Sequence, residues 1–236
     1  MSFDSSRDLS FVIGAFLGDG SFVEDSAYHH HVKLAVRDRE FADAFNFGVA
    51  KVLGRKVNTI TVTHDLGKTY FESKYSCRSL GLFLKWPLDQ LRPFMNDFPR
   101  EFLSGLFSAD GCASVSLRSF GLLASIILTN SRVELLSLVE ELLRTYFDIH
   151  SRTYLAKKRG ATWQYGKKTV VLRKDSYNLC INRRQDIKTF LSGIGFVIKR
   201  KQKLAEKAIH LIETLGRSRA GEVWRLSPNA SSMALA

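Results

Sequence analysis

The sequence has few cysteines and no segment suited to a membrane span or a secretion signal. Cys77, Cys112 and Cys180 are isolated and form no CxxC pair. Three separated cysteines argue against a disulfide framework and a cysteine zinc site. No apolar run approaches the roughly 20 residues that cross a bilayer, and the first ten residues lack the basic start of a signal peptide. We therefore expect a protein without a membrane partner that is not secreted, located in the cytoplasm or an organellar matrix.

The histidines of this sequence are not spaced as a metal site usually requires. His29, His30 and His31 are consecutive, so on a strand they point to alternating faces and cannot all ligate one ion. The spacing gives little support to a histidine metal site.

Positive charge, in contrast, is abundant. The chain carries 35 Lys and Arg against 23 Asp and Glu, a formal net charge of +12. Basic runs gather in the second half, in AKKRG at 156–160, GKKTVVLRK at 166–174, NRR at 182–184 and IKRKQK at 198–203. The charge alone would fit simple solubility, but this clustering favours a polyanionic partner. Nucleic acid fits better than a membrane surface, because no basic amphipathic helix presents a broad apolar face.

One ten-residue string occurs twice. FVIGAFLGDG at 11–20 and FLSGLFSADG at 102–111 share five positions, the last two being Asp-Gly. A single Asp-Gly is an ordinary turn dipeptide. Two copies in register, each ending an apolar helical stretch, indicate an internal repeat.

The hydrophobic period supports the repeat. Alternation in HVKLAVR (31–37), TITVT (59–63) and TYFESKYSCRS (69–79) predicts strands, and the three- and four-residue spacing within 38–54 predicts a helix with Asp38 at its N-cap and Gly54 at its C-cap. A similar order follows the second string, with Trp163 and Gln164 in a hairpin loop. We expect an α+β fold of two αββαββα repeats, residues 1–98 and 99–215, and a loosely ordered tail at 216–236.

The doubled string also predicts a close helix pair. Gly14 and Gly18 lie on one helical face, and Gly105 and Ala109 repeat this spacing in the second copy. If the two helices pack there, Asp19 and Asp110 meet at one end of the interface. Two carboxylates at helix C-termini repel each other and the helix dipoles, so we expect a compensating cation. Mg²⁺ accepts such oxygen ligands and suits metal-assisted hydrolysis of a phosphodiester.

Both strings resemble the signature motifs of the LAGLIDADG homing endonucleases, in their single-chain, two-motif form. The resemblance covers about residues 8–215 and implies motif helices at a central interface, with two curved antiparallel sheets forming a DNA-binding saddle. It further implies a monomeric, intron-encoded nuclease that cuts both strands of a long pseudo-palindromic or asymmetric site and leaves 3′ overhangs. Asp19 and Asp110 match the metal-binding acids, and the carbonyls of Gly18 and Ala109 match adjoining ligands for Mg²⁺, with Mn²⁺ or Ca²⁺ able to occupy the same sites.

Other site residues follow from the same resemblance. Lys201 falls where the family places a lysine that polarises the scissile region, although an ordinary solvated lysine would look the same. Asn130 lies near a position that often carries a water-positioning side chain. The matching place in the first repeat is Asp38, which could simply cap its helix.

Polar faces of the strands are expected to contact DNA, through bases or phosphates. The expected contacts in the first repeat are Lys33, Arg37, Glu72, Lys74, Ser76 and Arg78. In the second repeat they are Ser116, Arg118, Arg152, Lys157, Lys158, Lys168, Arg173, Asn178, Asn182 and Lys199.

Two other classes of function stay open. A protein with the same fold could be an RNA maturase that binds intron RNA, or a DNA-binding regulator that does not cleave. Loss of one acid would favour those classes, and both acids are present. An unrelated enzyme on an α/β scaffold would have to treat the two strings in register as coincidence.

Overall fold

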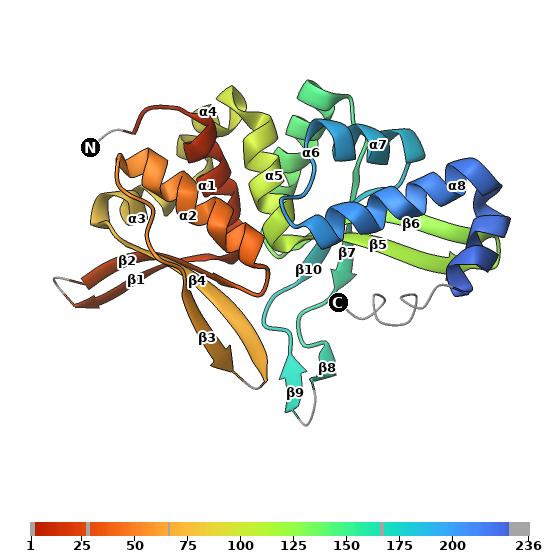
Figure 1. The fold of residues 1–236 in the computed structure, drawn as a ribbon, viewed down its shortest axis with the longest axis horizontal. Coiled ribbons are helices and arrows are strands. Elements are labelled where there is room, and N and C mark those ends of the chain that lie inside the picture. The colour runs from red at the N-terminus through yellow and green to blue at the C-terminus, as the bar shows by residue number, and fades with distance from the viewer. Residues whose placement is uncertain (1–2, 27–28, 66, 166–167, 227–236) are drawn as a thin grey trace. The chain divides into compact units, whose positions relative to one another are not determined.

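A computed structural model describes residues 3–226, apart from residues 27–28, 66 and 166–167. The chain divides into two compact units (Figure 1). The first unit contains Met1–Asp110 and Ile194–Arg200, and the second contains Gly111–Gly193 and Lys201–Ala236. The units thus divide after residue 110, whereas the repeats predicted from the sequence divide after residue 98, because the second motif helix packs within the first unit.

The first unit is a four-stranded antiparallel sheet with helices on one face. Its strands are arranged in the order β1-β2-β4-β3, and α1, α2 and α3 pack against the sheet (Figure 1). Its elements are α1 (Arg7–Asp19), β1 (Gly20–Ser26), β2 (His29–Val36), α2 (Arg39–Leu53), β3 (Thr61–Asp65), β4 (Lys68–Ser76), α3 (Arg78–Leu84), α4 (Leu88–Asp97) and α5 (Pro99–Asp110).

The second unit repeats this strand arrangement. Its main sheet has the order β5-β6-β10-β7, and β8 and β9 form a separate two-stranded ribbon. Its elements are β5 (Gly111–Arg118), β6 (Gly121–Asn130), α6 (Val133–Phe147), β7 (Arg152–Lys157), β8 (Thr162–Tyr165), β9 (Lys168–Val171), β10 (Ser176–Ile181), α7 (Arg184–Gly193) and α8 (Lys199–Arg225), whose first two residues belong to the first unit. The predicted α+β class with two repeats is confirmed.

Several boundaries follow from local chemistry. Ser6 caps α1, since its Oγ accepts a hydrogen bond of 3.2 Å from the N–H of Leu9. Gly54 ends α2 in the left-handed region at φ 60°, as its position after the apolar pattern predicts. Asp38 precedes α2 as expected, but its side chain makes no capping hydrogen bond.

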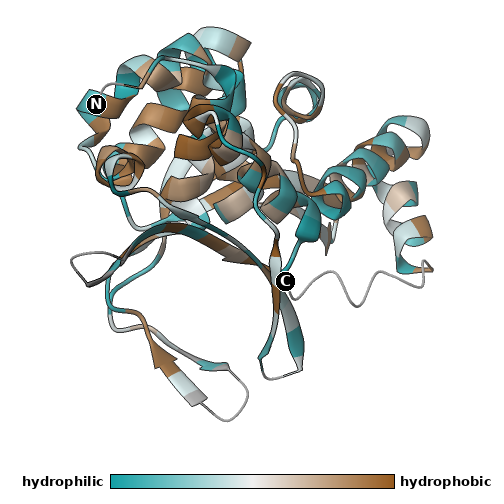
Figure 2. Cartoon of the chain, turned by 60° about the vertical axis from the view of Figure 1, so that its left-hand side comes forward, coloured by the Kyte–Doolittle hydropathy of each residue, from teal (hydrophilic) through white to brown (hydrophobic). Residues whose placement is uncertain are grey.

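The hydrophobic core of the first unit lies between the sheet and its helices. Figure 2 shows brown hydrophobic segments alternating with teal hydrophilic ones along these helices. On the sheet, Val32 and Leu34 of β2 are fully buried, whereas Lys33 between them is partly exposed. This is the alternation predicted for a strand with one covered face. In the part of the chain that the structure describes, no helix combines the length and the apolar character needed to span a membrane.

Two predictions about irregular segments are wrong. Trp163 and Gln164 lie on β8 rather than in a loop. The predicted tail is helical through Arg225, because α8 continues past a kink at Gly216 (φ 73°, ψ 162°). Beyond the kink Trp224 is only 6% exposed, and the predicted tail residues 227–236 lie outside the described part of the chain.

Candidate functional site

Helices α1 and α5 touch backbone to backbone. A Cβ added to Gly14 would stand 2.1 Å from the carbonyl oxygen of Phe102, and one added to Gly105 would stand 2.5 Å from that of Phe11. The two contacts are equivalent, because Gly14 and Phe11 occupy the same places in the first string as Gly105 and Phe102 in the second. Such approach requires residues without a side chain. The predicted close packing of the motif helices is confirmed.

The two aspartates end these helices on the same side of the crossing. Asp19 is the last residue of α1 and Asp110 the last residue of α5. A Cβ on Gly18 would lie 2.4 Å from the Cβ of Ala109 and 3.4 Å from the carboxyl carbon of Asp110. Asp19 is exposed and Asp110 half-buried, so both are within reach of a ligand in solvent.

The donor atoms at this end suit a hard divalent cation. Carboxylates and backbone carbonyls are oxygen ligands, which Mg²⁺, Mn²⁺ and Ca²⁺ accept. Among the described residues, no group of three or more His, Cys, Asp or Glu side chains is arranged to hold a metal ion. A cation at the aspartate pair therefore needs other oxygen donors, such as the carbonyls of Gly18 and Ala109, a phosphate or water.

Lys201 lies in the first turn of α8. Its Nζ donates a hydrogen bond of 2.7 Å to the carbonyl oxygen of Gly111, the residue that follows Asp110 in the sequence. It also lies near Cys112, where burial raises the pKa of the thiol and the charge of Lys201 opposes that rise. Lys201 is thus a partly buried, hydrogen-bonded lysine of the second unit rather than a freely solvated one.

Asn130 ends β6, where its Oδ1 accepts a hydrogen bond of 2.9 Å from the N–H of Arg132. This bond closes the turn that leads into α6. Its neighbour Thr129 donates a 2.8 Å hydrogen bond to Oδ1 of Asn178 on β10.

Asp38, the matching position in the first repeat, has a different partner. Its two carboxylate oxygens accept hydrogen bonds of 2.7 and 2.8 Å from Nε and a terminal nitrogen of Arg200. This bidentate contact, with desolvation opposing it, raises the pKa of the Arg200 guanidinium. The sequence alone gives no reason to single out Arg200, because it is one of several basic residues in its run.

Some of the polar side chains that are predicted to contact DNA in the first unit interact with neighbouring side chains. Lys33 of β2 lies opposite Lys74 of β4 in the register, and its Nζ lies 2.5 Å from Oε2 of Glu72. Ser76 Oγ hydrogen-bonds with the ring of His31 at 3.0 Å. Arg37 is exposed.

The sequence predicts Arg78 on the same strand as Lys74 and Ser76. This prediction is wrong, because β4 ends at Ser76 and Arg78 begins α3.

The predicted contacts of the second unit are spread over several elements. Ser116 and Arg118 lie on β5, and Asn178 lies on β10. Arg173 is in the bend between β9 and β10 rather than on a strand. The side chain of Lys168 falls outside what the structure describes. The remaining residues are exposed: Arg152 and Lys157 on β7, Lys158 just after it, Asn182 after β10, and Lys199 at the start of α8.

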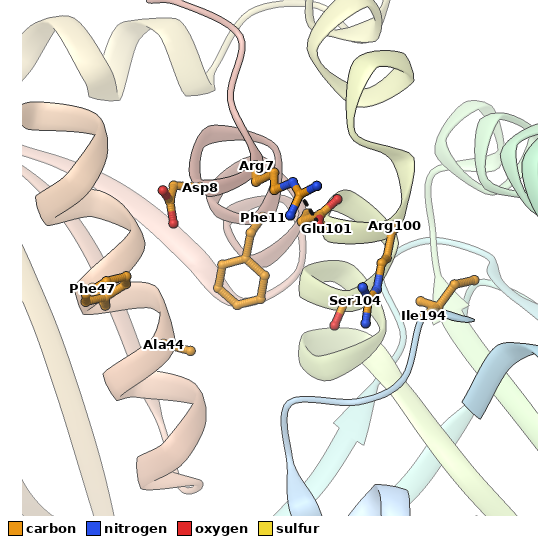
Figure 3. Close-up of a pocket in the computed structure, with 9 residues that line it drawn as sticks. All are labelled: Arg7, Asp8, Phe11, Ala44, Phe47, Arg100, Glu101, Ser104 and Ile194. Carbon is orange, nitrogen blue, oxygen red and sulfur yellow. Dashed lines mark ion pairs between the residues drawn. The ribbon is translucent and has the colours of Figure 1, made fainter. Parts of the chain in front are cut away.

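A pocket of about 350 Å³ lies at the opposite, N-terminal ends of α1 and α5 (Figure 3). It contains two arginines and two acids, with Arg7 3.9 Å from Glu101. Its lining residues are Arg7, Asp8, Phe11, Ala44, Phe47, Arg100, Glu101, Ser104 and Ile194. Because Asp19 and Asp110 end the other termini of these helices, the pocket is not part of the aspartate site.

Comparison with protein families finds LAGLIDADG-like domains in both halves. Residues 97–195 match the LAGLIDADG-like domain, and residues 9–68 match the WhiA LAGLIDADG-like domain. The uncharacterized protein MJ0398 of Methanocaldococcus jannaschii is 26% identical over 209 residues, which cover 88% of this chain and 73% of that protein.

Similar solved structures share the fold at low identity. The homing endonuclease I-DmoI in complex with DNA and Ca has a TM-score of 0.58 at 18% identity, covering 86% of this chain and 99% of that one. Its complex with DNA and Mn has a TM-score of 0.56 at 19% identity, covering 81% and 98%. Full-length DUF199/WhiA from Thermatoga maritima has a TM-score of 0.52 at 15% identity, covering 94% and 66%.

Proposed function

Because the chain belongs to the LAGLIDADG family, with one LAGLIDADG-like domain in each half, we propose that it is a site-specific endonuclease. It hydrolyses phosphodiester bonds in both strands of double-stranded DNA with divalent metal ions and leaves 3′ overhangs. The observation that carries this proposal is the pair of aspartates at the ends of α1 and α5, next to the contact between Gly18 and Ala109. A chain using this fold only to bind has no need for two carboxylates at the negative ends of two touching helices.

In this proposal Asp19 and Asp110 bind the metal ions, with the carbonyls of Gly18 and Ala109 as further ligands. Bound Mg²⁺ lowers the pKa of a water molecule and stabilises the leaving oxygen. Lys201 supplies positive charge near the scissile phosphate, and Asn130 orients water. The glycine contacts of α1 and α5 hold the two aspartates together before any ligand binds, which lowers the cost of assembling the site.

Double-stranded DNA is the proposed substrate. The net charge of +12 favours binding to phosphates, and the exposed basic residues on and beside the strands are the proposed contacts. I-DmoI, which shares the fold, has been crystallised with DNA and with Mn or Ca. Because both motifs occur in one chain, the proposed active particle is a monomer on a long pseudo-palindromic or asymmetric site, encoded within an intron.

A DNA-binding protein that does not cleave is the second candidate. The N-terminal half matches a WhiA-type domain, whereas the C-terminal half matches a different LAGLIDADG-like model. Because the two halves match different models, the DNA-binding protein that does not cleave remains a candidate. An RNA maturase that binds intron RNA would use the same charge, and binding assays with that RNA test it directly.

Cleavage of a randomised pool of duplex DNA tests the first candidate. The purified chain is incubated with the pool and Mg²⁺, and the new ends are sequenced, with the double substitution Asp19→Asn and Asp110→Asn as the control. We expect ends with 3′ overhangs from one family of long sequences, absent with the control and without metal. Selective retention of duplexes with no cut in Mg²⁺ or Mn²⁺ would support the second candidate instead.

A further inference from the structure

A short segment that leads into α8 and includes its first two residues packs in a different unit from the residues around it. We call Ile194–Arg200 the strap: it belongs to the first unit, whereas Gly193 and Lys201 on either side belong to the second. Ile194, Phe196 and Ile198 are at most 7% exposed. Alternate side chains of the strap are therefore buried from Ile194 to Ile198, so apolar contacts hold this part in place.

The strap is hydrogen-bonded to α5, the helix that ends in Asp110. Oγ of Ser104 donates a 3.1 Å hydrogen bond to the carbonyl oxygen of Gly195. Oγ of Ser108 accepts a 2.8 Å hydrogen bond from the N–H of Val197. Ser108 is fully buried and lies two residues before Asp110, so this contact acts on the last turn of α5.

The far end of the strap is fastened to the start of α2. Arg200 makes the bidentate contact with Asp38, and the N–H of Lys199 donates a 2.5 Å hydrogen bond to Oε1 of Glu40. Asp38 is mostly buried, with 18% of its side chain exposed, against 54% for Arg200. Because α2 packs on α1, the fastening ties the strap to the helix that ends in Asp19.

The glycine crossing needs such support. Gly14 and Gly105 set how closely the helices approach, but a contact between backbones resists sliding and rotation of one helix on the other less than interlocked side chains do. The strap contacts Ser104 and Ser108, one turn apart on α5, and this pair of hydrogen bonds opposes both motions.

We propose that Asp38 and Arg200 are positioning residues, which fasten the strap so that it holds α5 in a fixed register against α1 and thereby sets the spacing of Asp19 and Asp110. The effect on cleavage rests on the proposed function. The effect on α5 does not, since it follows from hydrogen bonds within the first unit. Asp38 therefore acts through α5 and does not touch the substrate.

Amide hydrogen exchange on the full-length protein without metal tests the structural step. With Arg200→Gln or Ser108→Ala, we expect the amides of residues 105–110 to exchange about tenfold faster, the effect of losing one hydrogen bond to a charged or buried group. The amides of α6 should not change. Lys188→Gln is the matched control, because Lys188 forms a 2.9 Å ion pair with Glu213 in the second unit.

The metal dependence of cleavage tests the functional step. Arg200→Gln should raise the Mg²⁺ concentration for half-maximal cleavage several-fold while DNA affinity in EDTA stays the same. Exchanging the charges, Asp38→Arg with Arg200→Asp, should restore much of the exchange protection and the metal requirement. A purely structural role would lower thermal stability without changing the metal requirement relative to Lys188→Gln.

The outcomes separate the two proposals. Unchanged exchange at residues 105–110 in both Arg200→Gln and Ser108→Ala would overturn the role of the strap, whatever the protein cleaves. Faster exchange in a protein that cuts no DNA would support the strap and reject the nuclease. Faster exchange with an unchanged Mg²⁺ requirement in an active nuclease would overturn the claim that the strap sets the spacing of the aspartates.

Discussion

Gly14 lies so close to Phe102 that a Cβ at position 14 would stand 2.1 Å from the carbonyl oxygen of that phenylalanine. The reciprocal contact, between Gly105 and Phe11, uses the equivalent residues of the two strings. The first phenylalanine of each string, Phe11 or Phe102, therefore meets the backbone of the first glycine of the other string, Gly105 or Gly14. The repeated apolar part of the string builds the helix crossing, and the repeated aspartate ends it.

Adding a side chain at either glycine should destabilise the fold. For Gly14→Ala or Gly105→Ala we expect a loss of about 1–3 kcal/mol in the free energy of unfolding, because the atom that the new Cβ meets is a backbone oxygen that cannot move alone. Gly14→Leu should cost more and remove activity together with folding. Chemical denaturation followed by circular dichroism measures each loss.

Gly193→Ala is the control for this series. Gly193 also lies in a helix, but its Cβ would find ordinary contacts, the nearest 3.5 Å away on the ring of Phe147. We expect a change below about 0.5 kcal/mol. Equal effects at positions 14 and 193 would show that loss of glycine, rather than the helix crossing, governs stability.

The buried thiol of Cys180 and the partly buried thiol of Cys112 give a prediction about pH. Burial raises the pKa of Cys112 and Cys180 above the ordinary 9.0. At pH 8.5 both should therefore react with iodoacetamide more slowly than free cysteine, because less thiolate is present. In the unfolded chain these thiols ionise first, so the free energy of unfolding should fall as the pH rises above 9.

Mass spectrometry of labelled peptides measures these rates, with the protein in denaturant as the control. In denaturant the two cysteines should label at the rate of free cysteine. Fast labelling of both in the native protein would mean that β5 and β10 open readily, contrary to the burial of Cys180.

Local patterns in the sequence predict much of the fold. The αββαββα order, Gly54 at the end of α2 and the glycines of the crossing all follow from residues close together in the chain. The contact of Asp38 with Arg200 could not be predicted, because 162 residues separate the partners and nothing near either one indicates the other. Asp38 looks like an N-cap from its neighbours, but its carboxylate forms the bidentate contact with Arg200 instead.

Composition also gives a wrong prediction where tertiary packing determines the local structure. The segment after Gly216 contains the small and polar residues of a loose tail, but Gly221 lies against the turn between β5 and β6, where its Cβ would be 3.3 Å from Cα of Gly121. Lys207 lies 5.3 Å from the ring of Trp224. These tertiary contacts keep residues 217–225 helical. At the candidate site, the two aspartates could be predicted from the repeated string. The roles of Ser104 and Ser108 could not, because they depend on a strap about 90 residues away in the sequence.

Binding to DNA should depend steeply on salt. Counterion release makes the logarithm of the affinity fall linearly with the logarithm of salt concentration, by about 0.9 per phosphate contact. We expect a loss of about a thousandfold between about 50 and 200 mM salt. Arg118→Gln should reduce this slope by about one. Lys188→Gln should leave the slope unchanged, because Lys188 lies on a helix and not on a strand that is proposed to contact DNA. Fluorescence anisotropy measures the slope, and a nearly flat line would remove the nucleic-acid proposal.

Neutralising either aspartate should separate activity from stability. For Asp19→Asn and Asp110→Asn we expect loss of Mg²⁺-dependent cleavage, with DNA affinity in EDTA largely intact. Because each carboxylate lies at the negative end of its own helix, and the proposed site brings the two like charges together, its removal should leave the melting temperature in EDTA unchanged, or raise stability by up to about 1 kcal/mol. Full cleavage by either variant would show that its acid is not essential, and a large drop in melting temperature would assign the aspartates a structural role.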